Sequence, residues 1–319
     1  MQVHLTFDIE VWCNGWQQLD QRFPAAFERY CYGRSAQGDY ALPKTLEILQ
    51  RHGLTGVFFV EPLFSARFGA SYLETMTGLI AVAGQDIQLH LHPEWTDELP
   101  APPIADAARK RQHLTYYTLD EQTALIGFGR RLLESATGRP VTAFRAGSFA
   151  ANHDTYLALA RNGIGVDSSL NAMADFSGCA LNVTDSTEDR RAIGGVQVYP
   201  VTVFRDGFGR LRPAQLGASS LVEMQAALLR LVAQGAGHAV LVSHNFEMLR
   251  APGSDPDWTV VRRFEGLCRW LAEHRDLFQV GPLPAQPAAS PAASHPRVQV
   301  PAGATLRRLL EQARRRLGG

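Results

Sequence analysis

The sequence has few cysteines, no net charge and no long apolar run. Its 319 residues include 4 cysteines, which lie far apart without a C-x-x-C pair, so neither a zinc knuckle nor a redox dithiol is predicted. No stretch approaches the roughly 18 apolar residues of a membrane-spanning helix. The formal net charge is zero, which argues against a protein built around polyanions, and we expect no nucleic-acid partner.

The first residues also lack the pattern of an export signal. They contain no basic segment followed by an apolar run, and they enter a predicted strand almost at once. The cysteine pattern fits a reducing compartment. Together these features predict a cytoplasmic protein.

What the sequence does contain is an alternation of strand and helix patterns. Strands are predicted at residues 3–8, 55–60, 86–92, 141–144, 165–167, 196–201, 239–243 and 277–280. Helices are predicted at 42–53, from Thr118 towards Gly138 behind a T-x-x-E capping box, and near 153–162, 220–234 and 257–274. This order indicates an α/β domain, either a β/α barrel or an open doubly wound sheet. In both, chemistry gathers at the carboxyl ends of the strands.

The C-terminal part differs in composition from residues 1–281, which are predicted to form the main domain. Residues 282–303 contain six prolines among alanines and serines, which predicts a linker without regular structure. Residues 304–319 are predicted to form a basic amphipathic helix with leucines at helical spacing and arginines on other faces. Such a helix can dock on the domain, contact another subunit or lie on an anionic membrane surface.

Two carboxylates stand at the end of the first predicted strand. Val3, Leu5 and Phe7 alternate with polar residues, so Asp8 and Glu10 leave the strand on the same face. Like charges this close require a cation or a proton between them. The alternative is an acidic strand end that is simply solvated.

The strand at 86–92 ends in a second polar pair. Alternation places His90 and His92 on one face, Pro93 ends the strand, and Glu94 follows. With Glu10 they predict a His/His/carboxylate site with an open coordination position. We expect a divalent metal there, Zn²⁺ first, with Co²⁺, Mn²⁺ or Fe²⁺ as alternatives that a carboxylate ligand admits.

Five short motifs occur in a recognisable order across most of residues 1–280. They are T-F-D-I-E at 6–10, H-L-H-P-E at 90–94, F-R-A-G-S at 144–148, D-S-S-L-N at 167–171 and L-V-S-H-N-F at 241–246. With them the chain resembles the polysaccharide deacetylase (NodB homology) family, carbohydrate esterase family four. That resemblance implies a distorted (β/α)7-type barrel, the NodB-like deacetylase barrel, with a divalent metal.

The resemblance implies roles at the first two motifs. Asp8 would be the catalytic base and Glu10 a metal ligand, although Ile9 separates them where the family has adjacent aspartates. Glu94 stands where the family usually has its second metal-binding histidine. Strand geometry favours His92 as the ligand and motif position favours Glu94, so both remain candidates beside His90.

The later motifs supply the other implied catalytic residues. Arg145 would pair with Asp8 and keep it ionised, and His244 would be the acid that protonates the leaving amine. Asp167 would hold His244 in its charged form.

These roles predict a metal-dependent hydrolase that removes an N-acetyl group from an amino sugar in a glycan or glycan precursor. The expected partner is a carbohydrate that carries N-acetyl groups. Two alternatives remain. One is a hydrolase of a small non-sugar amide on the same barrel, and the other is an inactive glycan-binding or scaffold protein.

Overall fold

The computed structural model describes residues 1–173, 186–188, 191–251, 253–284 and 294–317. Its strands are β1 (Gln2–Ile9), β2 (Arg34–Ser35), β3 (Gly38–Asp39), β4 (Val57–Val60), β5 (Asp86–Leu91), β6 (Ala143–Ala146), β7 (Val166–Asp167), β8 (Ser186–Glu188), β9 (Arg191–Ile193), β10 (Val196–Val198), β11 (Val203–Arg205), β12 (Leu211–Pro213), β13 (His238–His244), β14 (Gln279–Val280) and β15 (Ser294–Pro296). Its α-helices are α1 (Leu19–Phe27), α2 (Leu42–Arg51), α3 (Phe64–Phe68), α4 (Ala70–Val82), α5 (Leu119–Thr137), α6 (His153–Arg161), α7 (Leu221–Ala233), α8 (Trp258–Glu273) and α9 (Ala302–Leu317).

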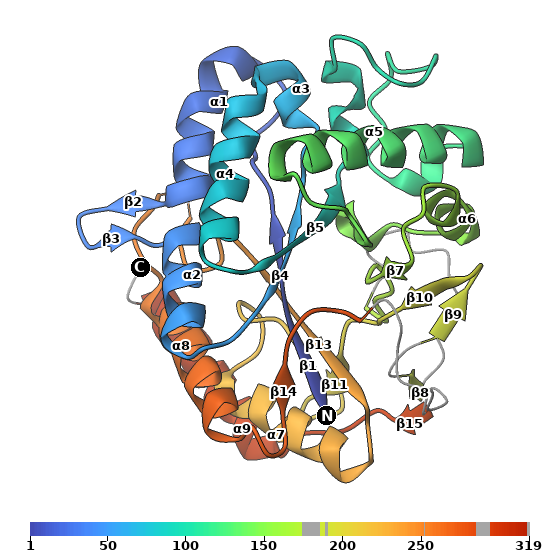
Figure 1. Ribbon diagram of the computed structural model, residues 1–319. Coiled ribbons are helices and arrows are strands. Elements are labelled where there is room, and N and C mark those ends of the chain that lie inside the picture. Colours follow the sequence, from blue (N-terminus) through green and yellow to red (C-terminus); the bar gives the residue numbers. More distant parts are fainter. Residues whose placement is uncertain (174–185, 189–190, 252, 285–293, 318–319) are drawn as a thin grey trace.

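The core of the fold is a curled, mostly parallel sheet with helices on its outer side (Figure 1). The strand order is β13-β1-β4-β5-β6-β7-β10-β9, with β14 also paired to β1 and β9 antiparallel to β10. Parallel neighbours with helical crossovers place the carboxyl ends of the parallel strands at one edge of the sheet. The α/β class predicted from the alternating pattern is confirmed.

Irregular backbone links the two sides of the curled sheet, and this makes the barrel a distorted one. The Thr202 amide donates to the Val240 carbonyl at 3.0 Å, and Gln215 bridges Val242 in parallel register. These two contacts connect the segments after β10 to β13. The predicted distorted barrel is therefore confirmed. The contacts of Thr202 and Gln215 with β13 form a seam at the place where regular strands would close an ideal barrel.

Packing differs on the two faces of the sheet. The larger apolar cluster lies between the sheet and the helices and includes alternate β1 residues such as Leu5 and Phe7. A smaller cluster that includes Val57, Phe59 and Val240 occupies the inside of the curl. The inside also holds polar side chains, since the Arg145 guanidinium lies 4.4 Å from the Phe59 ring centroid. The strand alternation thus directs apolar side chains outward to the helices, while the inner face carries polar side chains beside a smaller apolar cluster.

The predicted elements are all present, with strand bounds that differ from the predicted ones by at most three residues at either end. The Thr118 capping box before α5 forms as predicted, with reciprocal hydrogen bonds between Thr118 and Glu121. Helices α1, α3 and α4 were not predicted. Residue Gln18, which precedes α1, is in the left-handed region and supplies no side-chain cap, and Pro24 lies inside that helix, so the usual start signals are missing.

The segment predicted to be an unstructured linker is partly regular. Residues 294–296 form β15, which pairs with β8, and the last helix begins at Ala302 rather than at 304. Residues 285–293 of the predicted linker lie outside the described part of the chain. The correction has a physical cause, because Val298 and Val300 are buried and anchor the segment to the core.

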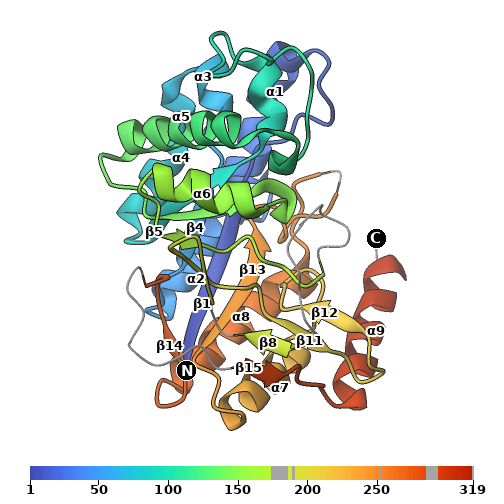
Figure 2. The same ribbon diagram turned by 90° about the vertical axis from the view of Figure 1, so that its right-hand side faces the viewer.

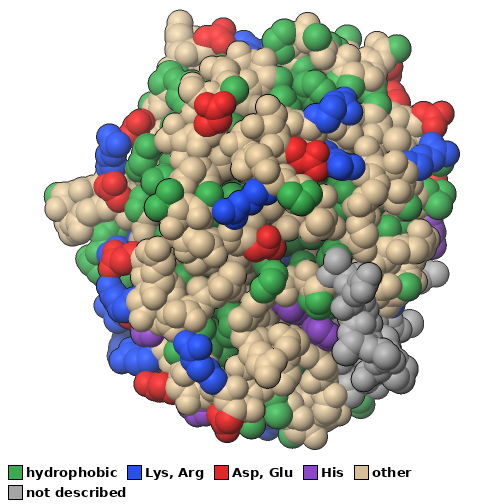
Figure 3. Space-filling view, viewed as in Figure 1, with side chains coloured by type: hydrophobic (Ala, Val, Ile, Leu, Met, Phe, Trp, Pro, Cys, Tyr) green, Lys and Arg blue, Asp and Glu red, His purple; other side chains and the backbone are tan. Residues whose placement is uncertain are grey.

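The C-terminal helix α9 packs on the domain beside α7 and α8 at the edge of the molecule (Figure 2). Elsewhere, on the face drawn in Figure 3, acidic and basic side chains are interspersed, which agrees with the zero net charge. Within the described residues, no helix combines the length and apolar character needed to cross a bilayer.

Candidate metal and catalytic centre

Six of the eight predicted site residues line one cavity at the carboxyl ends of β1, β5 and β13. The parallel register sets Asp8 beside His244 on neighbouring strands. A cavity of about 360 Å³ is lined by Asp8, Glu10, Trp12, His90, His92, Glu94, Gln112, Ala146, Ser148, Phe149 and His244. Residues more than 230 positions apart in the sequence therefore share one site because the strands run in parallel.

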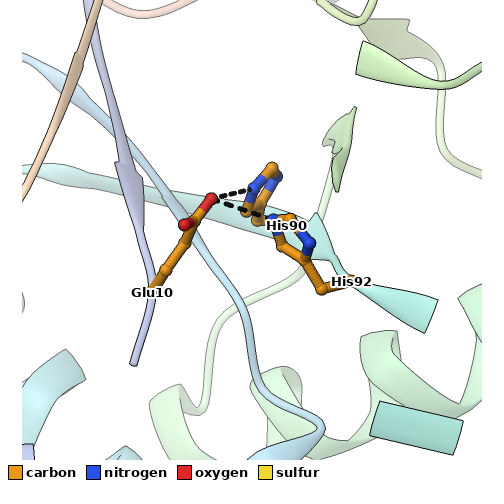
Figure 4. A group of neighbouring side chains, drawn as sticks. All are labelled: Glu10, His90 and His92. Atoms are coloured by element: carbon orange, nitrogen blue, oxygen red, sulfur yellow. Dashed lines mark hydrogen bonds and ion pairs between the residues drawn. The ribbon is translucent and has the colours of Figure 1, made fainter. Parts of the chain in front are cut away.

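Glu10, His90 and His92 form a compact buried cluster (Figure 4). The Glu10 Oε1 atom lies 3.0 Å from His90 Nε2 and 2.9 Å from His92 Nε2. One ligand atom from each residue lies within 4.8 Å of the others. Two imidazole nitrogens and a carboxylate oxygen at this spacing match the donor set that catalytic zinc sites use.

Hydrogen bonds behind the two imidazoles fix the orientation of each ring. His90 Nδ1 lies 2.8 Å from the Arg145 carbonyl oxygen, and His92 Nδ1 lies 3.1 Å from Glu94 Oε2. Both Nδ1 atoms therefore act as donors, which directs each Nε2 towards Glu10. Glu94 is thus placed behind His92, and the cluster within the described residues consists of Glu10, His90 and His92.

The charges of this cluster call for a cation between its members. Burial alone would raise the pKa of Glu10, but His92 and His90 hold it well below its ordinary value. Burial alone would lower the pKa of His92, but the carboxylates of Glu10 and Glu94 hold it well above its ordinary value. Positive charge between Glu10 and the two imidazoles stabilises the cluster. A divalent metal ion can supply that charge, so the residues present suit such an ion.

Backbone geometry next to the site requires glycine at position 147. A Cβ atom there would lie 2.7 Å from His92 Nδ1, which is closer than carbon atoms approach nitrogen without a shift. The following residues, Ser148 and Phe149, both have a positive φ of 55°, and Phe149 lines the cavity. The turn after β6 therefore packs directly against a candidate ligand.

Arg145 pairs with Asp8, as the motif resemblance implies. Its Nη1 donates to Asp8 Oδ1 at 2.7 Å, and both side chains are almost fully buried. The same guanidinium donates through Nε to the Ser168 carbonyl at 3.0 Å and through Nη2 to Ser168 Oγ at 2.9 Å. Three hydrogen bonds to fixed partners hold Arg145, and thereby Asp8, in one orientation.

The expected partnership between Asp167 and His244 is wrong in this structure. The Asp167 carboxylate accepts hydrogen bonds from the Ser169 amide at 2.8 Å and the Ser169 hydroxyl at 2.6 Å. Burial raises the pKa of Asp167 to about 6. Ser169 in turn accepts from the Ala146 amide at 2.8 Å, so Asp167 supports the strand that carries Arg145 rather than the acid.

Glu247 takes the place that Asp167 was expected to fill. Its Oε1 atom lies 3.0 Å from His244 Nδ1, and it is held by hydrogen bonds from Gln215 and the Gly217 amide. Burial alone would lower the pKa of His244, but Glu247, with the nearby charges of Glu10 and Asp8, raises it to about 9. Glu247 thus favours the protonated form of His244, which is the form that a general acid requires.

Two further residues of the site were not predicted from the sequence. Asn245 donates to the Glu10 carbonyl at 3.1 Å and accepts from the Glu10 amide at 3.3 Å, which fixes the end of β1. Trp12 donates through Nε1 to Glu10 Oε2 at 2.5 Å. The only sequence signal for these two residues was closeness along the chain to predicted site residues. Asn245 directly follows His244, and Trp12 lies two positions after Glu10.

Comparisons with known proteins agree with this fold. No family model and no curated protein sequence matches the chain. Among solved structures, a Mycobacterium smegmatis protein assigned as a polysaccharide deacetylase is 18% identical with a TM-score of 0.51, over 90% of this chain and 94% of that chain. At this identity the likeness shows the fold, which is that of NodB-like polysaccharide deacetylases.

Other solved structures align with lower scores. The family 4 carbohydrate esterase from Streptomyces lividans in complex with acetate is 14% identical, with a TM-score of 0.42 over 92% of this chain and 97% of that chain. The peptidoglycan deacetylase PdaC from Bacillus subtilis is 12% identical, with a TM-score of 0.41 over 98% of this chain and 96% of that chain.

Proposed function

We propose that this protein is a metal-dependent hydrolase that removes an N-acetyl group from an amino sugar in a glycan or glycan precursor. The observation that carries the proposal is the joint placement of Asp8, the Glu10/His90/His92 cluster and His244 in one cavity. A base, a metal-binding cluster and a protonated acid are the parts that hydrolysis of an amide requires. The fold shared with polysaccharide deacetylases supports the proposed deacetylation by analogy.

Glu10, His90 and His92 would hold the divalent metal, which supplies Lewis acidity that polarises a carbonyl and lowers the pKa of water. Asp8, held by Arg145 through Oδ1, accepts the proton as water attacks the amide carbon. His244 then donates its proton to the amine nitrogen as the carbon–nitrogen bond breaks. Acetate and a free amine are the products, and Trp12 and Phe149 supply apolar surface in the cavity for the substrate.

Release of acetate from N-acetylhexosamine oligosaccharides tests the proposal, with the wild type compared with Asp8→Asn. We expect the variant to lose about a hundredfold or more in kcat, because general-base catalysis is worth that much. It should still bind Zn²⁺, since Asp8 is not in the ligand cluster. Metal removal by a chelator should abolish wild-type activity, and added Zn²⁺ should restore it.

Asp120→Asn is the matched control, because Asp120 is exposed and forms a surface ion pair with Arg161. It should retain full activity. A wild type that binds metal but releases no acetate from any such oligosaccharide would contradict the sugar substrate and point to a different amide. A wild type that binds no metal would contradict the mechanism itself.

A further inference from the structure

Helix α9 is docked on the domain by its polar side. Arg308, Thr305 and Ala304 are buried, with 5% exposure or less, whereas Leu306, Leu309 and Leu310 are 51%, 42% and 61% exposed. An amphipathic helix on a globular domain normally buries its leucines and exposes its arginines. In α9 the leucines are instead exposed, and one arginine, Arg308, is buried.

Buried carboxylates on the domain explain this arrangement. Arg308 Nη2 donates to Asp206 Oδ2 at 3.0 Å, and its Nε donates to Glu223 Oε1 at 3.0 Å. About two helical turns further along α9, Arg315 Nε donates to Asp257 Oδ2 at 2.8 Å. All three carboxylates are at least nine-tenths buried, and a buried charge needs a paired cation. The polar side of α9 therefore faces inward, and the leucine side faces solvent.

A cationic groove adjoins this leucine face. It has a volume of about 570 Å³ and is lined by six arginines, together with Leu221, Trp258 and Leu310. The acidic residue on its wall, Glu311, accepts from Arg263 at 2.8 Å. Arg262 and Arg314 are exposed, and the Arg307 side chain is 67% exposed. The groove thus brings Trp258, which is 41% exposed, and arginines of α8 and α9 next to the exposed leucines of α9, and together they form one surface.

We propose that this surface, formed by Leu306, Leu309, Leu310, Trp258 and the flanking arginines, binds the interface of an anionic lipid bilayer. Apolar side chains enter the boundary between head groups and acyl chains, while arginines pair with lipid phosphates. A soluble polyanion would use the arginines but leave the leucines in water. A second copy of this chain would cover the leucines but bring a second set of arginines to the same contact, where like charges repel.

Vesicle co-sedimentation with the full chain tests the proposal. Binding is compared between vesicles of equal parts phosphatidylglycerol and phosphatidylcholine and vesicles of phosphatidylcholine alone. We expect binding to the anionic vesicles only, and weaker binding at high salt because the arginine contribution is screened. Leu306→Ser combined with Leu310→Ser should weaken binding about tenfold, since both side chains lose their burial in lipid.

Two further variants separate the contributions. Arg307→Ser combined with Arg314→Ser should also weaken binding about tenfold and should flatten its salt dependence. Leu157→Ser combined with Leu229→Ser is the matched control, because each leucine is 45% exposed elsewhere on the surface. That control should bind like the wild type.

Three results would overturn the proposal. The first is no binding to anionic vesicles, and the second is equal binding by the wild type and the Leu306/Leu310 variant. The third is a dimer in light scattering that this variant converts to a monomer, because the leucine face would then contact a second copy. Circular dichroism of each variant checks that the helix remains folded.

Discussion

At the residue scale, the site depends on side chains that orient other side chains. Glu94 was one of two candidate ligands, and the structure places its carboxylate 3.1 Å from His92 Nδ1. Arg145 positions Asp8, and Glu247 positions His244. Glu94, Arg145 and Glu247 thus set the orientation and the charge of their partners. The sequence motifs identify those partners but do not show how they are oriented.

Glu247→Gln tests the control of His244 by Glu247. Glu247 raises the pKa of His244, so removal of its charge should lower that pKa. Since the acid must be protonated, the alkaline limb of kcat/KM should move to lower pH, with about a tenfold loss at pH 9 and a smaller loss at pH 6. The measurement is the pH profile of acetate release.

Glu247→Asp is the variant that keeps the charge, and its alkaline limb should stay near that of the wild type. Equal loss of activity by Glu247→Gln at every pH would indicate a purely structural role, through the hydrogen bonds to Gln215 and Gly217.

At the element scale, patterns predicted which elements form but only part of how they meet. The eight predicted strands are present, because alternation and apolar runs in the sequence reflect which faces of each strand are buried in the sheet. The seam at Thr202 and Gln215 was not predicted, because single bridges between irregular segments leave no periodicity. The turn after β6 likewise depends on an approach to β5 that only the folded sheet creates.

Gly147→Ala tests that turn. The added Cβ would lie 2.7 Å from His92 Nδ1, so the imidazole should shift away from Glu94 and Glu10. Loss of this orientation should weaken Zn²⁺ binding by about tenfold to a hundredfold, the usual effect of disturbing the contacts behind a ligand. Isothermal titration calorimetry measures the affinity.

Gly165→Ala is the matched control, because its Cβ would meet no atom within 4 Å and the residue precedes the neighbouring strand β7. It should bind Zn²⁺ like the wild type. Equal affinity of the two variants would show that the turn does not hold His92 in place.

At the scale of the whole molecule, the polar interior of the curled sheet makes stability depend on pH. His4 is fully buried, with Nδ1 2.9 Å from the Gly281 carbonyl and Nε2 3.1 Å from His238 Nδ1. Burial lowers the pKa of His4 to about 4. These contacts join β1 to β13 and to the chain after β14, so they link the beginning and end of the domain.

The free energy of unfolding should fall as the pH drops from about 6.5 to about 4. In that range the unfolded chain binds a proton at His4 that the folded protein does not, so protonation favours unfolding. The loss attributable to His4 is about 3 kcal/mol, at roughly 1.4 kcal/mol for each pKa unit. Urea unfolding at pH 7 and pH 4 measures it.

The comparison variant is His4→Gln, which cannot titrate and should show a smaller difference between the two pH values. Buried carboxyls with raised pKa, such as Asp167, act in the opposite direction in both proteins and cancel in the comparison. Parallel profiles for the two proteins would contradict the assignment to His4.

The sequence by itself determined the strand ends that carry Asp8, Glu10, His90 and His244, because alternation and chain breaks are local. It also determined the α/β class. Only the tertiary structure decided that His92 joins Glu10 and His90 while Glu94 lies behind it, and that Glu247 rather than Asp167 contacts His244.

The tertiary structure also decided which side of α9 faces inward. Helical spacing predicts that the leucines and most arginines lie on different faces of the helix. It does not show which face contacts the domain. Buried Asp206, Glu223 and Asp257 selected the arginine side, because an unpaired buried carboxylate costs more than an exposed leucine.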